Sequence, residues 1–132
     1  MDDAPGREAA HRRRQELSLT ERERVEERVS ALLDLLGKAH TMALLREFAF
    51  AEGPLRFSEL EETLGISPNT LSLRLSKLVD VGLLDRVSYD EIPPRVEYYP
   101  TDRAEDLFPA FGHLHRWAVE HALDDTTETE VS

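Results

Sequence analysis

The feature that most constrains this chain is a short amphipathic helix whose two ends are both marked in the sequence. Ser67 and Pro68 predict its start, because a serine side chain caps the free amides of a first helical turn and proline fits that turn. Gly82 predicts its end. Leucines recur at helical spacing between these residues, which predicts one buried face and one exposed face.

A shorter helix is expected immediately before this one. Residues 58–64 predict it, with Ser58 as its cap because Glu61 follows at the spacing of a capping box. Gly65 is expected to end it and leaves only a tight turn before the next helix. Residues 55–57 predict a short strand ahead of both helices.

Two β-rich segments follow the amphipathic helix. Residues 83–89 and 95–99 predict strands, and Pro93 and Pro94 stiffen the turn between them. Two helices joined by a tight turn and followed by a hairpin can place one helix in the DNA major groove and the hairpin beside it. We therefore expect a mainly α fold with a small β-wing (α+β), a winged helix-turn-helix, and a DNA-binding transcriptional regulator as its function.

The exposed face of the amphipathic helix carries the side chains expected to contact DNA. Amide and hydroxyl groups suit base edges, arginine and lysine suit phosphates, and a leucine can touch a thymine methyl group or cover a neighbour. The predicted contacts on this helix are Ser67, Asn69, Thr70, Ser72, Leu73, Arg74 and Lys77. Those on the backbone side and the wing are Arg56, Ser58, Arg86, Tyr89 and Arg95.

Helices are also expected on both sides of this arrangement. Thr20 and Glu23 predict the capped start of a long helix that ends at Gly37. This helix is charged except for one apolar stripe, which suits packing against a second subunit. The last helix, over residues 102–121, is expected to kink at Pro109. The predicted dimer contacts are Val25, Val29, Leu32, Leu33, Leu36, Phe111, Leu114, Trp117 and Ala118.

The charge of the chain opposes a simple DNA-binding interpretation. Its 27 acidic and 16 basic residues give a net charge of −11, whereas DNA-binding proteins are usually basic. One interpretation is a salt-rich cytoplasm, in which acidic surfaces keep proteins soluble. Two alternatives remain open: a winged-helix protein-interaction module without DNA binding, and a ligand-responsive regulator with a pocket near the dimer helices.

Other functions find little support in the sequence. The chain has no cysteine, which excludes disulfides and thiolate zinc sites, and His113 and His115 diverge on a helix, so neither a metal site nor a cofactor is expected. No catalytic motif points to an enzyme. The charged N-terminus and the lack of a long apolar run predict neither a secretory signal nor a membrane span, so a cytoplasmic location is expected. We expect a flexible polar arm over residues 1–19, one domain over 20–122 and an acidic disordered tail over 123–132.

Several motifs of the chain together resemble the HxlR-type winged helix-turn-helix regulators. They are RFSEL (Arg56–Leu60), GIS (Gly65–Ser67), LSLRLSKL (Leu71–Leu78), GLLDR (Gly82–Arg86) and PPRVEY (Pro93–Tyr98). The resemblance covers about residues 32–120, and PPRVEY after a wing strand is its most specific part. It implies a homodimeric transcription regulator whose N-terminal and C-terminal helices form the dimer interface and whose two recognition helices read a two-fold symmetric operator.

The chain departs from this family pattern in two places. Leu35–Lys38 resembles a family element in which a tryptophan often follows the lysine, but Ala39 and His40 stand here instead. Some members sense oxidants through a cysteine near the first helix; Ser30 lies in that region, so thiol sensing cannot operate in this chain. The acidic, lysine-poor composition resembles halophilic archaeal members of the family.

Overall fold

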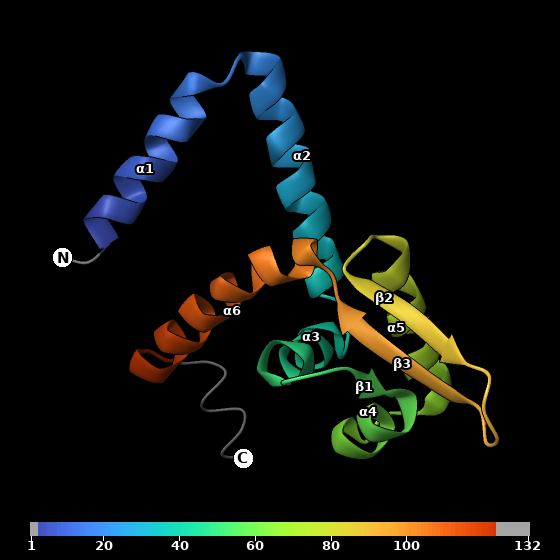
Figure 1. The fold of residues 1–132 in the computed structure, drawn as a ribbon. Coiled ribbons are helices and arrows are strands. Elements are labelled where there is room, and N and C mark those ends of the chain that lie inside the picture. Colours follow the sequence, from blue (N-terminus) through green and yellow to red (C-terminus); the bar gives the residue numbers. More distant parts are fainter. Residues whose placement is uncertain (1–2, 124–132) are drawn as a thin grey trace. The chain divides into compact units, whose positions relative to one another are not determined.

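A computed structural model describes residues 3–123 of this chain, and Figure 1 shows its fold. The described residues form six helices and three strands, in two compact units that comprise residues 1–41 and 42–132. None of the described helices is both long enough and apolar enough to cross a membrane. The elements are α1 (Asp3–Glu16), α2 (Leu19–Leu36), α3 (Thr41–Phe50), β1 (Leu55–Arg56), α4 (Phe57–Leu64), α5 (Pro68–Asp80), β2 (Leu84–Tyr89), β3 (Arg95–Pro100) and α6 (Asp102–Glu120).

The structure describes only part of the three segments that the sequence predicts, residues 1–19, 20–122 and 123–132. The predicted tail over residues 123–132 lies outside the described residues except for Leu123. The predicted main domain over residues 20–122 would join α2, which belongs to the N-terminal unit, to the C-terminal unit, and it stays a prediction.

In the N-terminal unit, the cap of α2 lies earlier than the sequence predicts. The Ser18 hydroxyl oxygen accepts a hydrogen bond from the Glu21 amide at 3.1 Å, and the Glu21 carboxylate accepts one from the Ser18 amide at 3.4 Å. The predicted cap, Thr20, is therefore wrong. Ser18–Glu21 and Thr20–Glu23 have the same spacing, but serine is the better cap, and Thr20 then lies inside the first turn.

Residues 3–16 form helix α1 where the sequence predicts a flexible arm. Pro5 lies in the first turn, which tolerates proline because an amide there has no helical partner. The last turn of α1 is attached to α2 by polar contacts: the Arg14 guanidinium lies 2.8 Å from the Glu26 carboxylate, and Arg22 donates to the Arg14 carbonyl at 2.9 Å. The end of α1 thus contacts α2 through side chains 8 to 12 residues apart in sequence, which periodicity alone does not reveal.

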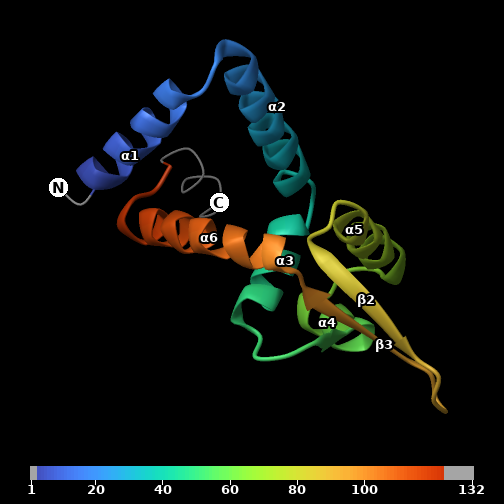
Figure 2. The ribbon, with the colours of Figure 1, turned by 45° about the horizontal axis from the view of Figure 1, so that its top comes forward.

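The C-terminal unit packs α3, α4, α5 and α6 with a small antiparallel sheet (Figures 1 and 2). The strand order is β1-β3-β2, so β3 is central. Leu71, Leu75 and Leu78 are each 0% exposed, which confirms the buried face predicted for α5. The other buried hydrophobic residues are Leu44, Leu45, Phe48, Leu60, Ile66, Leu83, Leu84, Tyr98, Ala104 and Phe111.

Strand β1 runs directly into α4 and thereby fixes the start of this helix at Phe57. The Arg56 amide, at the end of the strand, donates to the Glu59 carboxylate at 2.8 Å. The prediction of Ser58 as the cap is wrong, because the strand sets the start earlier and Ser58 lies inside the first turn. Gly65 ends the helix as predicted, at a φ of 63° that glycine adopts without steric cost.

The start of α5 is confirmed in detail. The Ser67 hydroxyl oxygen accepts a hydrogen bond from the Thr70 amide at 3.2 Å, and Pro68 is the first helical residue. The cap therefore satisfies one of the amides that a helix start leaves without a partner. It also fixes the point at which the polar face of α5 begins.

Ser67→Ala is expected to lower the free energy of unfolding by about 1 kcal/mol, because it removes this cap. Urea denaturation of the full chain measures the change. Ser72→Ala makes the same chemical change in the exposed middle of α5 and is expected to be neutral or slightly stabilising. Equal losses in both variants would show that the Ser67 cap contributes nothing specific.

The end of α5 is joined to the start of α6 around Gly82. Gly82 has a φ of 80°, and a Cβ atom there would lie 3.2 Å from the Arg103 guanidinium. Arg103 donates to the Val81 carbonyl at 2.9 Å, and the Thr101 hydroxyl donates to the Gly82 carbonyl at 2.7 Å. The Thr101 oxygen also accepts from the Ala104 amide and so caps α6. One short segment therefore holds two helix ends together.

Helix α6 continues from Asp102 to Glu120 through Pro109, where the sequence predicts a kink. A proline removes one hydrogen bond and crowds the preceding turn, so it bends a helix more often than it ends it. The helix continues on both sides of Pro109, and the apolar side chains before and after it keep a helical spacing.

The hairpin of β2 and β3 presents two faces of different chemistry. The strands pair along their whole length, from Leu84 opposite Pro100 to Tyr89 opposite Arg95. Side chains alternate between the faces of a strand and paired residues share a face, so the register assigns each side chain. The inner face, toward α5, includes Arg86, Val96 and Tyr98; the outer face carries Arg56, Tyr89, Arg95, Glu97 and Tyr99.

Candidate nucleic-acid interface

One side of α5 is open to solvent and mostly polar. Asn69, Ser72, Ser76 and Lys77 are exposed on it, and Leu73 among them is 65% exposed. At 100° per residue these positions form one strip along the helix, which we call the polar strip. Its amide and hydroxyl groups have the chemistry that reads base edges, and Leu73 offers an apolar contact of the kind that a thymine methyl group accepts.

Three predicted contacts on α5 are less available than the polar strip. The Ser67 and Thr70 hydroxyls hydrogen-bond to each other at 3.0 Å, and Ser67 is also occupied as the cap. Thr70 and Arg74 are half-buried, at the edge of the strip. Helix-start residues of this kind position the helix, whereas the exposed strip is free to face a groove.

A hollow of about 440 Å³ separates α5 from the inner face of the sheet. Ser72 and Ser76 line it from α5, and Arg86 lines it from β2. Asp80 lines the same hollow, so the predicted wing contact Arg86 has an acidic neighbour. Ser76 is not among the predicted contacts, although its position on the polar strip follows from the same helical periodicity.

The other predicted wing residues gather on the outer face. The Arg95 guanidinium carbon lies 4.1 Å from the centroid of the Tyr89 ring, which is a cation–π distance. Two carboxylates flank the same guanidinium at 3.5 Å, those of Glu91 and Glu97. Glu97 also lies 3.8 Å from the Arg56 guanidinium. The structure thus brings Arg56, Tyr89 and Arg95 together, around a carboxylate that the sequence analysis does not single out.

Two tyrosines hold this carboxylate from its other side. The Tyr99 hydroxyl donates to Glu97 Oε1 at 3.1 Å, and the Tyr99 and Tyr89 hydroxyls lie 3.0 Å apart. The hydrogen bond with Tyr89, then burial, then the hydrogen bond with Glu97 raise the pKa of Tyr99 to about 12. The Tyr99 hydroxyl therefore stays protonated over the whole physiological pH range, and it donates a hydrogen bond to Glu97.

A cleft of about 500 Å³, which we call the wing cleft, lies between the start of α4 and the hairpin turn. Arg56 and Ser58 line it from the α4 side, and Arg95 lines it from the wing together with the carboxylate of Glu91. The hairpin turn beside it carries Ile92, which is fully exposed, and Pro93. Two guanidinium groups and a hydroxyl at one cleft suit the oxygens of a backbone phosphate.

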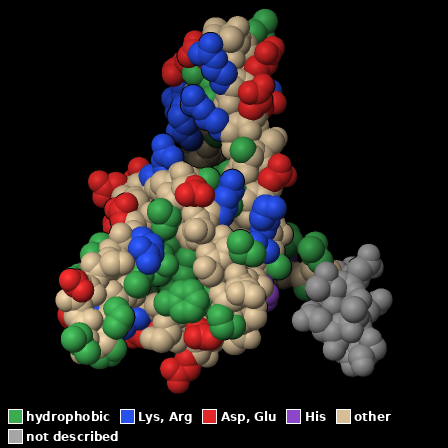
Figure 3. Space-filling model, turned by 90° about the vertical axis from the view of Figure 1, so that its right-hand side faces the viewer, with side chains coloured by type: hydrophobic (Ala, Val, Ile, Leu, Met, Phe, Trp, Pro, Cys, Tyr) green, Lys and Arg blue, Asp and Glu red, His purple; other side chains and the backbone are tan. Residues whose placement is uncertain are grey.

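The face of the C-terminal unit that Figure 3 shows carries no continuous basic band of the kind found in many DNA-binding proteins. On the globular lower part of the view in Figure 3, basic side chains stand apart from one another among acidic and apolar ones. This distribution agrees with the net charge of −11. Attraction to phosphates is therefore concentrated at a few arginines, and each of them matters more than it would on a basic surface.

The apolar stripe predicted on α2 lies at the surface. Val25, Val29 and Leu33 are exposed, Leu32 and Leu36 are half-buried, and α2 contains no buried residue among those described. A helix with an uncovered apolar stripe gains stability when a partner covers it.

The predicted dimer contacts on α6 divide into two groups. Leu114, Trp117 and Ala118 are exposed. Phe111 is 6% exposed and belongs to the core, where its ring centroid lies 6.0 Å from that of Phe108. Of the predicted dimer contacts on α6, the exposed ones therefore all lie after Phe111.

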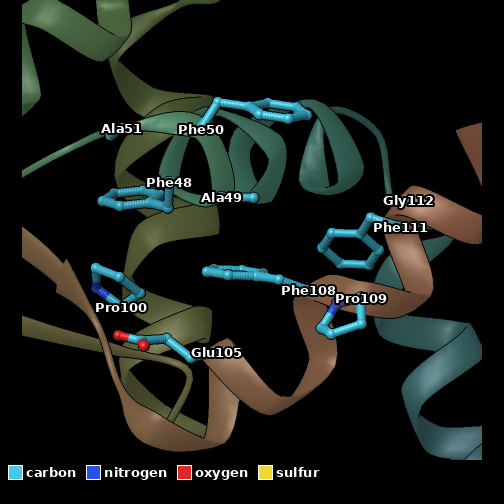
Figure 4. A pocket seen from close by; sticks show the side chains of 10 residues that line it. All are labelled: Phe48, Ala49, Phe50, Ala51, Pro100, Glu105, Phe108, Pro109, Phe111 and Gly112. Carbon is cyan, nitrogen blue, oxygen red and sulfur yellow. The ribbon is translucent and has the colours of Figure 1, made fainter.

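A second hollow, of about 480 Å³, lies between the end of α3 and the first half of α6. Figure 4 shows the rings of Phe48, Phe108 and Phe111 around it, with the Glu105 carboxylate near Pro100. Its walls are predominantly apolar and aromatic. Such walls could contact a small apolar ligand.

Within the described part of the chain, no three histidine or carboxylate side chains come together as a metal site would require. The ring of His121 contacts that of Trp117 in a tilted arrangement, at a centroid distance of 5.0 Å. This histidine thus belongs to the apolar end of α6.

Helices α4 and α5, the turn between them and the β2–β3 hairpin define a winged helix-turn-helix, which confirms the expected fold class. Residues 35–126 match the family described as HxlR-like helix-turn-helix. The chain belongs to this family, and the resemblance found in the sequence is confirmed.

Known relatives and solved structures carry consistent names. An HTH-type transcriptional regulator of Mycobacterium tuberculosis, itself described as uncharacterized, is 45% identical over 95 residues, which are 72% of this chain and 59% of the relative. A similarly described regulator of Halalkalibacterium halodurans is 38% identical over 90 residues, 67% of this chain and 79% of the relative. The reduced form of the transcriptional regulator YodB from B. subtilis superposes with a TM-score of 0.62 at 29% identity, covering 69% of this chain and 88% of YodB.

This chain thus spans only 59% of the length of its mycobacterial relative. The relatives are named as transcriptional regulators and not as enzymes, in line with the sequence analysis.

Proposed function

We propose that this protein is a DNA-binding transcriptional regulator that places α5 in a major groove and its wing beside it. The polar strip of α5 carries this proposal, because it is exposed on a helix whose other face is held rigidly in the core. The wing cleft supports it, since Arg56, Ser58 and Arg95 offer a phosphate two cations and a hydroxyl. Such a regulator acts on chromosomal DNA in the cytoplasm.

We further propose that the protein acts as a homodimer on a two-fold symmetric site. The uncovered apolar stripe of α2 and the exposed apolar end of α6 support this assembly, because both stabilise the protein only when they are covered. Two copies of α5 would then enter successive major grooves, about one helical turn of DNA apart. Occupation of such an operator blocks or redirects RNA polymerase.

Selection of bound duplexes from a random pool, followed by fluorescence anisotropy with the full chain, tests the proposal. We expect enrichment of a sequence with two-fold symmetry and an affinity that falls steeply with salt. Absence of binding to any duplex at low salt would refute the DNA-binding function. Binding of a protein partner instead would support the interaction-module alternative.

Asn69→Ala is expected to relax sequence preference without abolishing binding. Asparagine pairs with adenine through two hydrogen bonds, which contribute about 1–3 kcal/mol of discrimination, or roughly 10- to 100-fold. Anisotropy titrations of the selected duplex and of its single-base variants measure the change. Thr63→Ala, an exposed change on α4, is the control and should leave the preference intact. Unaltered discrimination in Asn69→Ala would remove this residue from base readout.

A second candidate function, a ligand-responsive regulator, is favoured by the aromatic hollow between α3 and α6. A small apolar ligand there would contact Phe108 and Phe111 and thereby the first half of α6. Thermal shift measurements with a library of small aromatic compounds test this candidate. Compounds that raise the melting temperature of the wild type but not of Phe108→Ala would support it, and a library without such compounds would count against it.

A further inference from the structure

We propose that Glu97 competes with DNA phosphates for the two arginines of the wing cleft, and so limits binding to DNA of arbitrary sequence. This inference rests on the proposed DNA-binding function. It assigns a role to a residue whose charge is opposite to the one that a DNA interface usually requires.

The position of Glu97 between the arginines carries the first step. Its Oε2 atom lies 3.5 Å from Arg95 Nε and 3.8 Å from Arg56 Nε. The strand register places all three side chains on the outer face, with Arg56 directly opposite Glu97. One carboxylate thus partly neutralises two guanidinium groups that come from different strands.

The second step is that this carboxylate is fixed in place. The Glu97 side chain is only 12% exposed, whereas those of Arg95 and Arg56 are 29% and 51% exposed. The Tyr99 hydroxyl holds Oε1, which leaves Oε2 toward the arginines. Low exposure and this hydrogen bond hold the Glu97 carboxylate beside the arginines, so its charge remains near a phosphate that binds there.

The third step compares the strength of the competing contacts. Both Glu97–arginine distances exceed those of a charge-assisted hydrogen bond, about 2.7–2.9 Å, which a phosphate oxygen can form with an arginine. A phosphate can therefore still bind, but it gains less than it would from unpaired cations. Because all sequences share the same phosphates, this reduction applies to every duplex and leaves discrimination to the polar strip of α5.

Glu97→Gln tests the inference, because it keeps the shape of the side chain and removes its charge. Asp106→Asn is the matched control: it removes one charge from an exposed position on α6. Anisotropy titrations use the full chain, a selected duplex and a duplex of scrambled sequence, at salt concentrations from about 50 to 300 mM.

At about 0.1 M salt we expect Glu97→Gln to bind the scrambled duplex about three- to tenfold more tightly than the wild type does. The dependence of log affinity on log salt should steepen by up to about one unit, as expected for one more neutralised phosphate. Asp106→Asn should change the affinity less than about twofold, because salt screens a distant surface charge. In Arg56→Ala/Arg95→Ala, the addition of Glu97→Gln should give a much smaller gain.

Each outcome has a distinct meaning. Unchanged or weaker binding by a folded Glu97→Gln variant overturns the inference, and weaker binding would show that Glu97 instead holds the arginines in a productive position. Equal gains in Glu97→Gln and Asp106→Asn also overturn it, since the effect would then be one of net charge. Failure of the wild type to bind any duplex refutes the proposed function itself. Glu97→Asp, which withdraws the carboxylate by one methylene group, replaces the glutamine variant if that variant does not fold; it should shift the affinity in the same direction.

Discussion

Leu75→Ala is expected to lower the free energy of unfolding by about 2–5 kcal/mol, a large fraction of the stability of a domain of this size. Leu75 is 0% exposed in the middle of α5, and its truncation leaves a cavity that neighbouring side chains fill only in part. Leu73→Ala makes the same chemical change two positions away on the same helix. Because Leu73 is 65% exposed, its change should alter stability by less than about 0.5 kcal/mol.

Urea denaturation followed by circular dichroism measures both variants. The pair also separates stability from recognition, since Leu73 belongs to the polar strip: Leu73→Ala should unfold like the wild type, and any loss of DNA affinity then reports a contact. Similar destabilisation by the two variants would contradict the assigned orientation of α5, and with it the face proposed to enter the groove.

Leu33→Asp is expected to weaken self-association by about 100-fold or more, and to weaken binding to a two-fold symmetric operator with it. The change places an unpaired charge in the apolar stripe of α2, twice in a symmetric dimer, where desolvation of each carboxylate is costly. Ala31→Asp is the matched control. Ala31 is exposed on the same helix but about 140° or more from the centre of the stripe, so its change should leave association nearly intact.

Analytical ultracentrifugation over a range of concentrations gives the dissociation constants of the two variants. Binding to one half-site and to the complete operator shows whether the loss of affinity comes from the loss of the second copy. A Leu33→Asp protein that remains dimeric would exclude this part of α2 from the interface. A monomeric wild type would refute the proposed assembly.

The sequence predicts best the elements whose signals are local. Ser67, Pro68 and the leucine spacing locate α5 and its buried face without any knowledge of tertiary contacts. Elsewhere two sequence signals indicate different helix starts, and tertiary contacts decide which of them is used. Ser58 has the spacing of a cap, but the strand that ends at Arg56 sets the start of α4 first. Helix α1 is absent from the prediction because contacts of Arg14 and Arg22 with other segments hold it.

In the candidate site, too, local patterns predict some residues, and only the tertiary structure reveals the others. The polar strip of α5 follows from helical periodicity, so most of its residues are predicted. Glu97 is not predicted, although Arg95 and Glu97 are two residues apart and must share a face of any strand. Its second partner, Arg56, becomes visible only through the register of β1 with β3, which sequence patterns do not provide.

The junction at Gly82 couples the C-terminal end of α5 to the orientation of α6. Arg103 and Thr101 link the two helices by hydrogen bonds, and the Arg103 side chain packs closely against Gly82. In a symmetric dimer assembled through α6, a tilt of that helix would move both copies of α5 through the Gly82 junction. Substitutions at Gly82, Thr101 or Arg103 would then change the half-site spacing that the dimer prefers, although none of the three lies on the polar strip.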